Sequence, residues 1–122
     1  NRTKVRAEQF VTDFGARLKI IEWANASQVL GDVNILINST SLGMAGRPPL
    51  SISLDRLNRK ALVTDLVYTP LDTPLLKAAR EKGCDTVDGL GMLIHQAVAG
   101  FARWFGEKPE ADQAARDVLL SE

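Results

Sequence analysis

Apolar residues recur along much of the chain at the spacing i, i+3, i+4, i+7, which predicts amphipathic helices. We expect four helices, each bounded by a capping residue, a proline or a glycine: Thr3 to Gly15, Thr73 to Gly83, Asp88 to Gly106, and from Pro109 onward. The residues expected on their apolar faces are Ala7, Phe10, Val11, Phe14, Leu75, Leu76, Ala79, Leu93, Ile94, Ala97, Phe101, Phe105, Ala111, Ala114, Ala115 and Val118.

Short apolar runs lie between these helices and predict strands. Residues 33–37 and 61–67 are rich in β-branched side chains, which is typical of strands buried on both faces. Shorter strands are expected at 18–23 and 86–87, and a proline-bearing loop at 44–54. Strands that alternate with helices predict an α/β fold with a doubly wound parallel sheet.

Composition narrows the class of protein. With 45% hydrophobic residues, 122 residues are enough for one domain, or part of one, to bury a core. Lys+Arg and Asp+Glu are balanced at 15 each, so we expect neither a nucleic-acid partner nor binding to an acidic membrane surface. The single cysteine, Cys84, has no disulfide partner and no metal-ligand companions, which favours the cytoplasm and no metal. No apolar run approaches the roughly 20 residues of a membrane span.

Three apolar runs break abruptly into small polar residues and glycine. The breaks occupy residues 38–44, 65–70 and 88–96. Parallel strands end in this way at a ligand crevice, so three breaks in one short chain predict a cofactor cleft. A Gly-rich G-x-G-x-x-G turn does not occur in the sequence. Because the chain enters a helical pattern directly at Asn1-Arg2-Thr3, we expect it to be the later part of a longer domain.

These motifs, taken in order with Asn1-Arg2-Thr3 and Arg6, resemble shikimate dehydrogenase, an NADP-dependent family, from Asn1 to about Trp104. The resemblance implies that residues 1–122 form the later part of a Rossmann-like NADP-binding domain. The first strands and the Gly-rich loop would lie outside this sequence. So would the substrate-binding domain, whose lysine and aspartate serve proton transfer in the family. No catalytic residue is therefore assigned here.

The resemblance assigns NADP to three places in the chain. Arg2 and Arg6 would grip the 2′-phosphate, together with Asn1 and Thr3, since a guanidinium fork suits a phosphate. A capped helix with two solvated arginines is the alternative. The adenosine and ribose side would lie against Ser39, Thr40 and Ser41, largely through main-chain groups; the alternative is an ordinary polar turn. The residues expected to flank the nicotinamide are Leu66, Gly89, Met92 and Leu93.

Two residues are expected to reach the substrate, shikimate or 3-dehydroshikimate. By the resemblance, Tyr68 points its hydroxyl at the substrate and Gln96 hydrogen-bonds a substrate hydroxyl. For Tyr68 the alternative is a packing residue, and for Met92 and Leu93 it is ordinary core. We expect Asp65 to hold loop backbone and Asp88 to cap a helix, while His95 lies at the surface.

The implied reaction is the reversible reduction of 3-dehydroshikimate to shikimate with NADPH. Alternatives are a quinate/shikimate dehydrogenase that uses NAD, a non-catalytic binding module of the same fold, and a purely structural α/β domain. We expect the 122 residues alone to be inactive and poorly stable. An edge exposed on the strand at 33–37 predicts self-association or a companion chain that carries the missing half.

Overall fold

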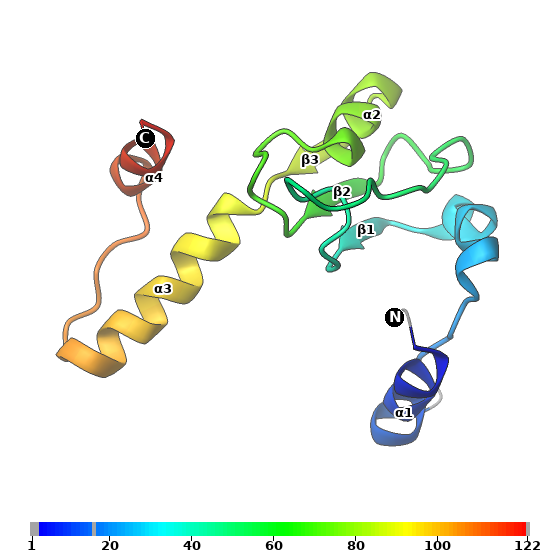
Figure 1. The fold of residues 1–122 in the computed structure, drawn as a ribbon, viewed down its shortest axis with the longest axis horizontal. Helices are drawn as coiled ribbons and strands as arrows, with labels where there is room; N and C mark the ends of the chain where they lie inside the picture. Colours follow the sequence, from blue (N-terminus) through cyan, green and yellow to red (C-terminus); the bar gives the residue numbers. More distant parts are fainter. Residues whose placement is uncertain (1–2, 16, 122) are drawn as a thin grey trace.

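A computed structural model describes residues 3–15 and 17–121. Figure 1 shows a small sheet with one helix in the middle of the molecule and the other helices extending to either side. The elements in chain order are α1 (Lys4–Phe14), the 3-10 helix η1 (Trp23–Asp32), β1 (Ile35–Asn38), β2 (Leu62–Asp65), α2 (Pro74–Lys82), β3 (Asp85–Val87), α3 (Leu90–Phe105) and α4 (Gln113–Leu120). No helix among them is long and apolar enough to cross a membrane.

The three strands form one parallel sheet in the order β1-β2-β3. In the register of β1 on β2, Ile35 lies opposite Leu62 and Asn38 opposite Asp65, so the two strands end side by side. This order is that of the last three strands in a doubly wound sheet of order 3-2-1-4-5-6. The predicted α/β fold with a parallel sheet is confirmed. β1 is an edge strand of the described sheet, and its Ile35 and Ile37 are more than half exposed, so the prediction that residues 33–37 are buried on both faces is wrong within the described structure.

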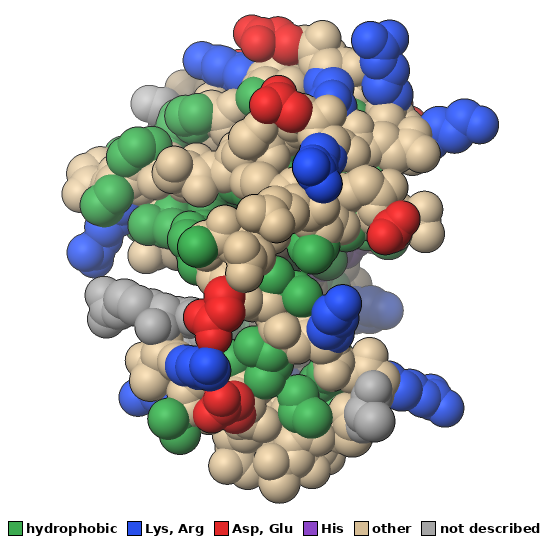
Figure 2. Space-filling view, turned by 90° about the vertical axis from the view of Figure 1, so that its right-hand side faces the viewer, with side chains coloured by type: hydrophobic (Ala, Val, Ile, Leu, Met, Phe, Trp, Pro, Cys, Tyr) green, Lys and Arg blue, Asp and Glu red, His purple; other side chains and the backbone are tan. Residues whose placement is uncertain are grey.

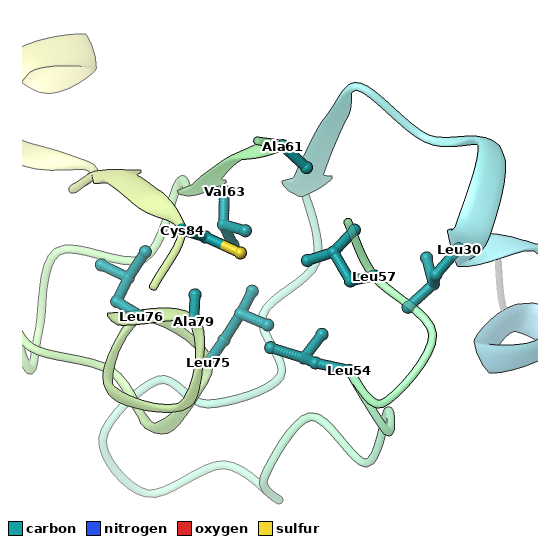
Figure 3. Packing of buried hydrophobic residues seen from close by; sticks show 9 residues of the cluster. All are labelled: Leu30, Leu54, Leu57, Ala61, Val63, Leu75, Leu76, Ala79 and Cys84. Carbon is teal, nitrogen blue, oxygen red and sulfur yellow. The ribbon is translucent and has the colours of Figure 1, made fainter. Parts of the chain in front are cut away.

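The hydrophobic core lies between the sheet, α2 and the loop that leads into β2 (Figure 3). From α2 it takes the predicted face, with Leu76 1% and Ala79 0% exposed. The other members are Leu30, Leu54, Leu57, Ala61, Val63, Leu75 and Cys84. The segment 44–54 is a loop, as predicted, and its Leu54 closes one end of the core.

Helix α2 has the ends that the sequence predicts. The Thr73 hydroxyl accepts a hydrogen bond from the N–H of Leu76, and Pro74 occupies the first helical position. Gly83 ends the helix at φ 89°, a left-handed conformation that favours glycine. These local signals hold the helix in place between β2 and β3.

The strand predicted at 18–23 is wrong. Residues 18–22 belong to no strand, and Trp23 already begins η1. An extended segment becomes a strand only when a neighbour takes up its backbone hydrogen bonds, and in the described part of the chain none pairs with it. The backbone bonds locally instead, with the N–H of Asn25 donating to Glu22 O at 2.9 Å.

The last helix begins at Gln113, four residues after the predicted start at Pro109. The reason is Asp112, whose carboxylate accepts from the N–H of Ala115 at 2.9 Å and caps the helix. Ala115 is half-buried, whereas Ala114 and Val118 are exposed. The predicted apolar face of this helix is thus only partly covered.

Helices α1 and α3 have nearly the predicted bounds, with Gly15 and Gly106 after their last turns, but their apolar faces are open. On α1, Phe10 and Phe14 are 51% and 68% exposed. On α3, Leu93 and Ile94 are half-buried, but Phe101 and Phe105 are 41% and 66% exposed, and Ala97 is exposed too. Figure 2 shows hydrophobic side chains at the surface on the α1 side of the molecule. Within the described structure, the prediction that the apolar face of α3 points inward is wrong for Ala97, Phe101 and Phe105.

Candidate functional site at the carboxyl ends of the strands

A buried polar network joins the ends of β1 and β2. Asp65 is 0% exposed, and its Oδ1 accepts from the Nδ2 of Asn38 at 2.9 Å and from the N–H of Val67 at 3.0 Å. Its Oδ2 accepts from the hydroxyl of Thr73 at 2.7 Å. Three partners from three segments therefore satisfy one buried carboxylate, as its burial requires. The prediction that Asp65 holds loop backbone is confirmed.

Asn38 extends this network into the loop after β1. Its Nδ2 also donates to Leu42 O at 3.0 Å, and its Oδ1 accepts from the N–H and the hydroxyl of Thr40 at 3.1 and 2.8 Å. The Thr40 hydroxyl in turn accepts from the N–H of Leu42 at 3.1 Å. The loop is thus fixed by its own side chains, while Ser39 and Ser41 are exposed.

This network changes how Thr40 can serve a ligand. Its hydroxyl donates to Asn38 and accepts from Leu42, so it has little hydrogen-bonding capacity left. Contact with an adenosine would come from the exposed Ser39 and Ser41 and from main-chain groups of the loop. The sequence signal for Asn38, which was missed, is a lone polar residue at the end of a β-branched run.

The start of α3 passes closely against the end of β2. A Cβ at Gly89 would lie 2.5 Å from Leu66 O and 2.7 Å from Val67 O, too close for any side chain. Glycine is therefore required here by the protein's own backbone, where we had expected the nicotinamide to impose it. The contact brings together Leu66 and Gly89, two residues predicted to flank the same ring.

Asp88 holds the first turn of α3. Its Oδ1 accepts from the N–H of Leu90 at 3.0 Å, but the N-cap position of α3 is Gly89, so Asp88 holds the turn before the helix and the prediction that it is the N-cap is wrong. Its two oxygens also pair with the guanidinium of Arg116 on α4, at 3.1 and 2.5 Å. Partial burial raises the pKa of Asp88, but Arg116 and the Leu90 N–H outweigh it and hold that pKa below its usual range.

The residues expected to face the nicotinamide and the substrate lie in the segments after β2 and at the start of α3, and they are exposed or half-buried. Met92 is 37% exposed and Leu93 half-buried, and Leu93 N–H donates to Gly89 O at 3.2 Å. Tyr68 is 42% exposed, so it is no buried packing residue, and Gln96 is exposed on α3. The single histidine, His95, is exposed as predicted.

The predicted 2′-phosphate site lies only partly within the described residues. Asn1 and Arg2 lie outside the described residues. Thr3 precedes α1 at the capping position, and Arg6 is exposed on α1. Among residues 3–15 and 17–121, no group of three or more His, Cys, Asp or Glu is placed to hold a metal ion.

Comparisons with known proteins agree with this architecture. Residues 89–119 match the family model of the shikimate 5′-dehydrogenase C-terminal domain. The chain is 51% identical over 121 residues to shikimate dehydrogenase (NADP(+)) of Paracoccus denitrificans and 52% identical over 120 residues to that of Roseobacter denitrificans. These matches cover 99% and 98% of the chain but 43% of each relative.

Solved structures give the same result. A quinate dehydrogenase from Corynebacterium glutamicum in complex with NAD superposes with a TM-score of 0.81 at 32% identity, over 99% of this chain and 43% of that one. Shikimate 5-dehydrogenase from Thermus thermophilus in complex with NADP(H) and shikimate superposes with a TM-score of 0.73 at 29% identity, over 91% and 40%. The chain spans less than half the length of these proteins; within that span it is similar to shikimate dehydrogenases, and residues 89–119 match the family's C-terminal domain.

Proposed function

We propose that this chain is the NADP-binding part of a shikimate dehydrogenase, which reduces 3-dehydroshikimate to shikimate reversibly with NADPH. The observation that carries the proposal is the contact of Gly89 with the backbone of Leu66 and Val67. The contact brings the end of β2 and the start of α3 together, and sheets of this type bind nucleotides at the carboxyl ends of their strands. Relatives about half identical in sequence are named NADP-dependent shikimate dehydrogenases.

The residues assigned to the cofactor have the chemistry that a dinucleotide needs. Exposed Ser39 and Ser41 can bond the adenosine ribose, and exposed Arg6, with Arg2, supplies cations for a 2′-phosphate. Met92 and Leu93 offer an apolar wall that excludes water from the nicotinamide. When bound, NADPH supplies the hydride, while protein groups bind and orient the reactants. This chain's contribution to the substrate is Tyr68 and Gln96, and the proton is handled outside it.

A second candidate is a quinate/shikimate dehydrogenase that uses NAD. It is favoured by one observation, the close superposition on a quinate dehydrogenase that holds NAD. The two candidates differ in what they require at the start of the chain. A 2′-phosphate needs the arginines, whereas the 2′-hydroxyl of NAD does not.

The experiment that tests the proposal uses the full-length polypeptide and steady-state kinetics with NADPH and NADH. Arg2→Ala and Arg6→Ala should each remove a charged hydrogen bond of about 1.5–3 kcal/mol, or roughly 10–100-fold in kcat/KM for NADPH. Activity with NADH should not change. Exposed Arg17, which follows α1, is the matched control, and Arg17→Ala should alter neither. Equal use of NADH and NADPH, with quinate turned over as well as shikimate, would select the second candidate.

Two further parts of the proposal concern the surroundings of the chain. The open apolar faces of α1 and α3 support association, either with a second copy or with a companion that carries the rest of the domain. Sedimentation of the 122-residue chain should therefore show species larger than a monomer; a cooperative monomer would contradict this.

The single, buried Cys84 supports a reducing compartment, for which we propose the cytoplasm.

A further inference from the structure

The contact between α4 and the start of α3 is centred on one charged pair. Arg116 donates through both of its terminal nitrogens to the two oxygens of Asp88, at 3.1 and 2.5 Å. Each side chain is 25% exposed, so the pair is three-quarters withdrawn from water. A bidentate, partly buried pair of this kind fixes both distance and orientation, unlike an exposed single contact such as Lys4 with Glu22.

Asp88 passes this restraint on to the turn that follows it. The same Oδ1 that meets Arg116 accepts from the N–H of Leu90, and the next carbonyl, that of Gly89, accepts from the N–H of Leu93. Gly89 itself has no freedom to move toward β2, because its Cα already lies against the backbone of Leu66 and Val67. The turn is therefore held from one side by β2 and from the other by Arg116.

Helix α4 has little else to hold it. Of its eight residues, only Ala115 and Arg116 are half-buried, and its only element neighbour in the described part of the chain is α3. Figure 1 shows the linker after α3 turning back, so that α4 returns toward the beginning of α3. A helix that buries so little apolar surface adds little stability by packing. Its charged contact is made at the one turn predicted to line the nicotinamide.

We propose that Arg116 is a positioning residue, which acts through Asp88 to fix Gly89, Met92 and Leu93 against the nicotinamide end of the cofactor. The inference rests on the proposed function, because it takes those three residues to be the nicotinamide wall. Without the ion pair of Arg116 with Asp88, the turn can shift away from β2, since the backbone at the end of β2 blocks movement toward it. A displacement of about 1 Å at a hydride-transfer site can cost up to 100-fold in rate. The adenosine end of the cofactor is assigned to the loop after β1, which Arg116 does not touch, so its contacts should be unchanged.

The test uses the full-length polypeptide and two probes: NADPH, and 2′,5′-ADP, which has the phosphate and adenosine but no nicotinamide. For Arg116→Gln we expect kcat with NADPH to fall about 10–100-fold. The Kd of 2′,5′-ADP should stay within about twofold, since Ser39, Ser41 and the arginines are untouched. Arg116→Lys, which keeps the charge but offers no fork, should restore part of the rate.

Arg103 provides the matched control. It is an exposed arginine on α3, thirteen residues and therefore roughly 20 Å from the start of that helix. Arg103→Gln removes the same charge and should leave kcat unchanged. If Arg116→Gln fails to fold, Asp88→Asn gives the same reading, because its amide oxygen still accepts from Leu90 while the ion pair is lost.

Two results would overturn the inference. The first is a lower melting temperature for Arg116→Gln with kcat unchanged, because Arg116 would then hold only α4. The second is equal weakening of NADPH and 2′,5′-ADP binding, which would mean a general loss of structure. Failure of the proposed function has a different signature: the unmodified protein would bind neither probe, and the inference would fall with it.

Discussion

The middle of the molecule and its outlying helices carry the same amphipathic spacing but bury it to very different extents. On α2, Leu76 is 1% exposed and Ala79 0%, whereas on α3 Phe101 and Phe105 are 41% and 66% exposed. Helix α2 packs on β2 and β3, while α3 meets only α4 and α1 meets no other helix or strand of the described residues. The spacing thus predicts that a helix has an apolar face, but whether that face is buried depends on the elements that pack against it.

The candidate site lies on the border between these two regions. Leu90, at the first position of α3, is 4% exposed, and no later residue of α3 is buried. The strand ends are therefore tied into the packed region, while α3, which carries Met92 and Gln96, is buried only at its start. The following predictions compare substitutions in the packed region with substitutions in the outlying helices.

The largest effect is expected in the core. Leu76→Ala removes a fully buried side chain between α2 and the sheet and should lower the free energy of unfolding by about 2–5 kcal/mol in a urea titration. Phe105→Ala, a larger truncation on the outlying α3, should change it by less than about 0.5 kcal/mol. Comparable losses from the two variants would mean that the outlying helices are packed as tightly as the core.

The next effect concerns the polar network inside the packed region. Asp65→Ala leaves the amide of Asn38 and the hydroxyl of Thr73 without their partner, which should cost about 1–3 kcal/mol of unfolding free energy. Asp55→Ala is the control, because Asp55 is exposed in the loop before β2. If both variants melt at the same temperature, the carboxylate does not tie the strand ends together.

At the border itself, two glycines two residues apart should respond with opposite signs. Gly89→Ala forces a Cβ onto the carbonyls of Leu66 and Val67 and should destabilise the protein by about 1–3 kcal/mol. Gly91→Ala meets nothing within 4 Å in the first turn of α3 and should stabilise it by about 0.4–1 kcal/mol. Calorimetric melting of both variants checks the pair, and a matching sign in the two would refute the close approach at Gly89.

The smallest effect is the pH dependence of the Asp88 pair. Because the pKa of Asp88 is lowered in the folded state, its contribution to stability is present above its unfolded pKa of about 3.9. That contribution is lost as the pH falls through the lower, folded value. Unfolding titrations between about pH 6 and about pH 2, roughly two units either side of the unfolded pKa, should show a steeper loss than Arg116→Gln shows. Parallel pH profiles would mean that the pair contributes nothing.

Local signals in the sequence predicted much of the fold. The strands β1 and β2, the ends of α2 and the parallel sheet follow from β-branched runs, from Thr73-Pro74 and from Gly83, all of which act within a few residues. The strand at 18–23 was wrong because strand formation needs a neighbour, which no local pattern supplies. The start of α4 was misplaced because the cap at Asp112 outweighed the proline at Pro109.

The candidate site was predicted in outline only. The three strand breaks and the supporting role of Asp65 follow from residue types at the ends of apolar runs, whereas the contact of Gly89 with the backbone after β2 was not predicted. The partners Asn38 and Arg116 were missed because each lies 27 or 28 residues from the carboxylate that it meets. A contact over that separation is set by sheet register and helix packing, which leave no periodic trace in the sequence.

The bond between Asn38 and Asp65 has a consequence for how the sheet assembles. The two residues are direct partners across β1 and β2, and sliding either strand by one position would turn one of them to the opposite face. A carboxylate and an amide would then be stranded in apolar surroundings, at a cost of several kcal/mol. The pair therefore favours the native register of β1 on β2, and the loop after β1 depends on that register because Asn38 also bonds Thr40 and Leu42.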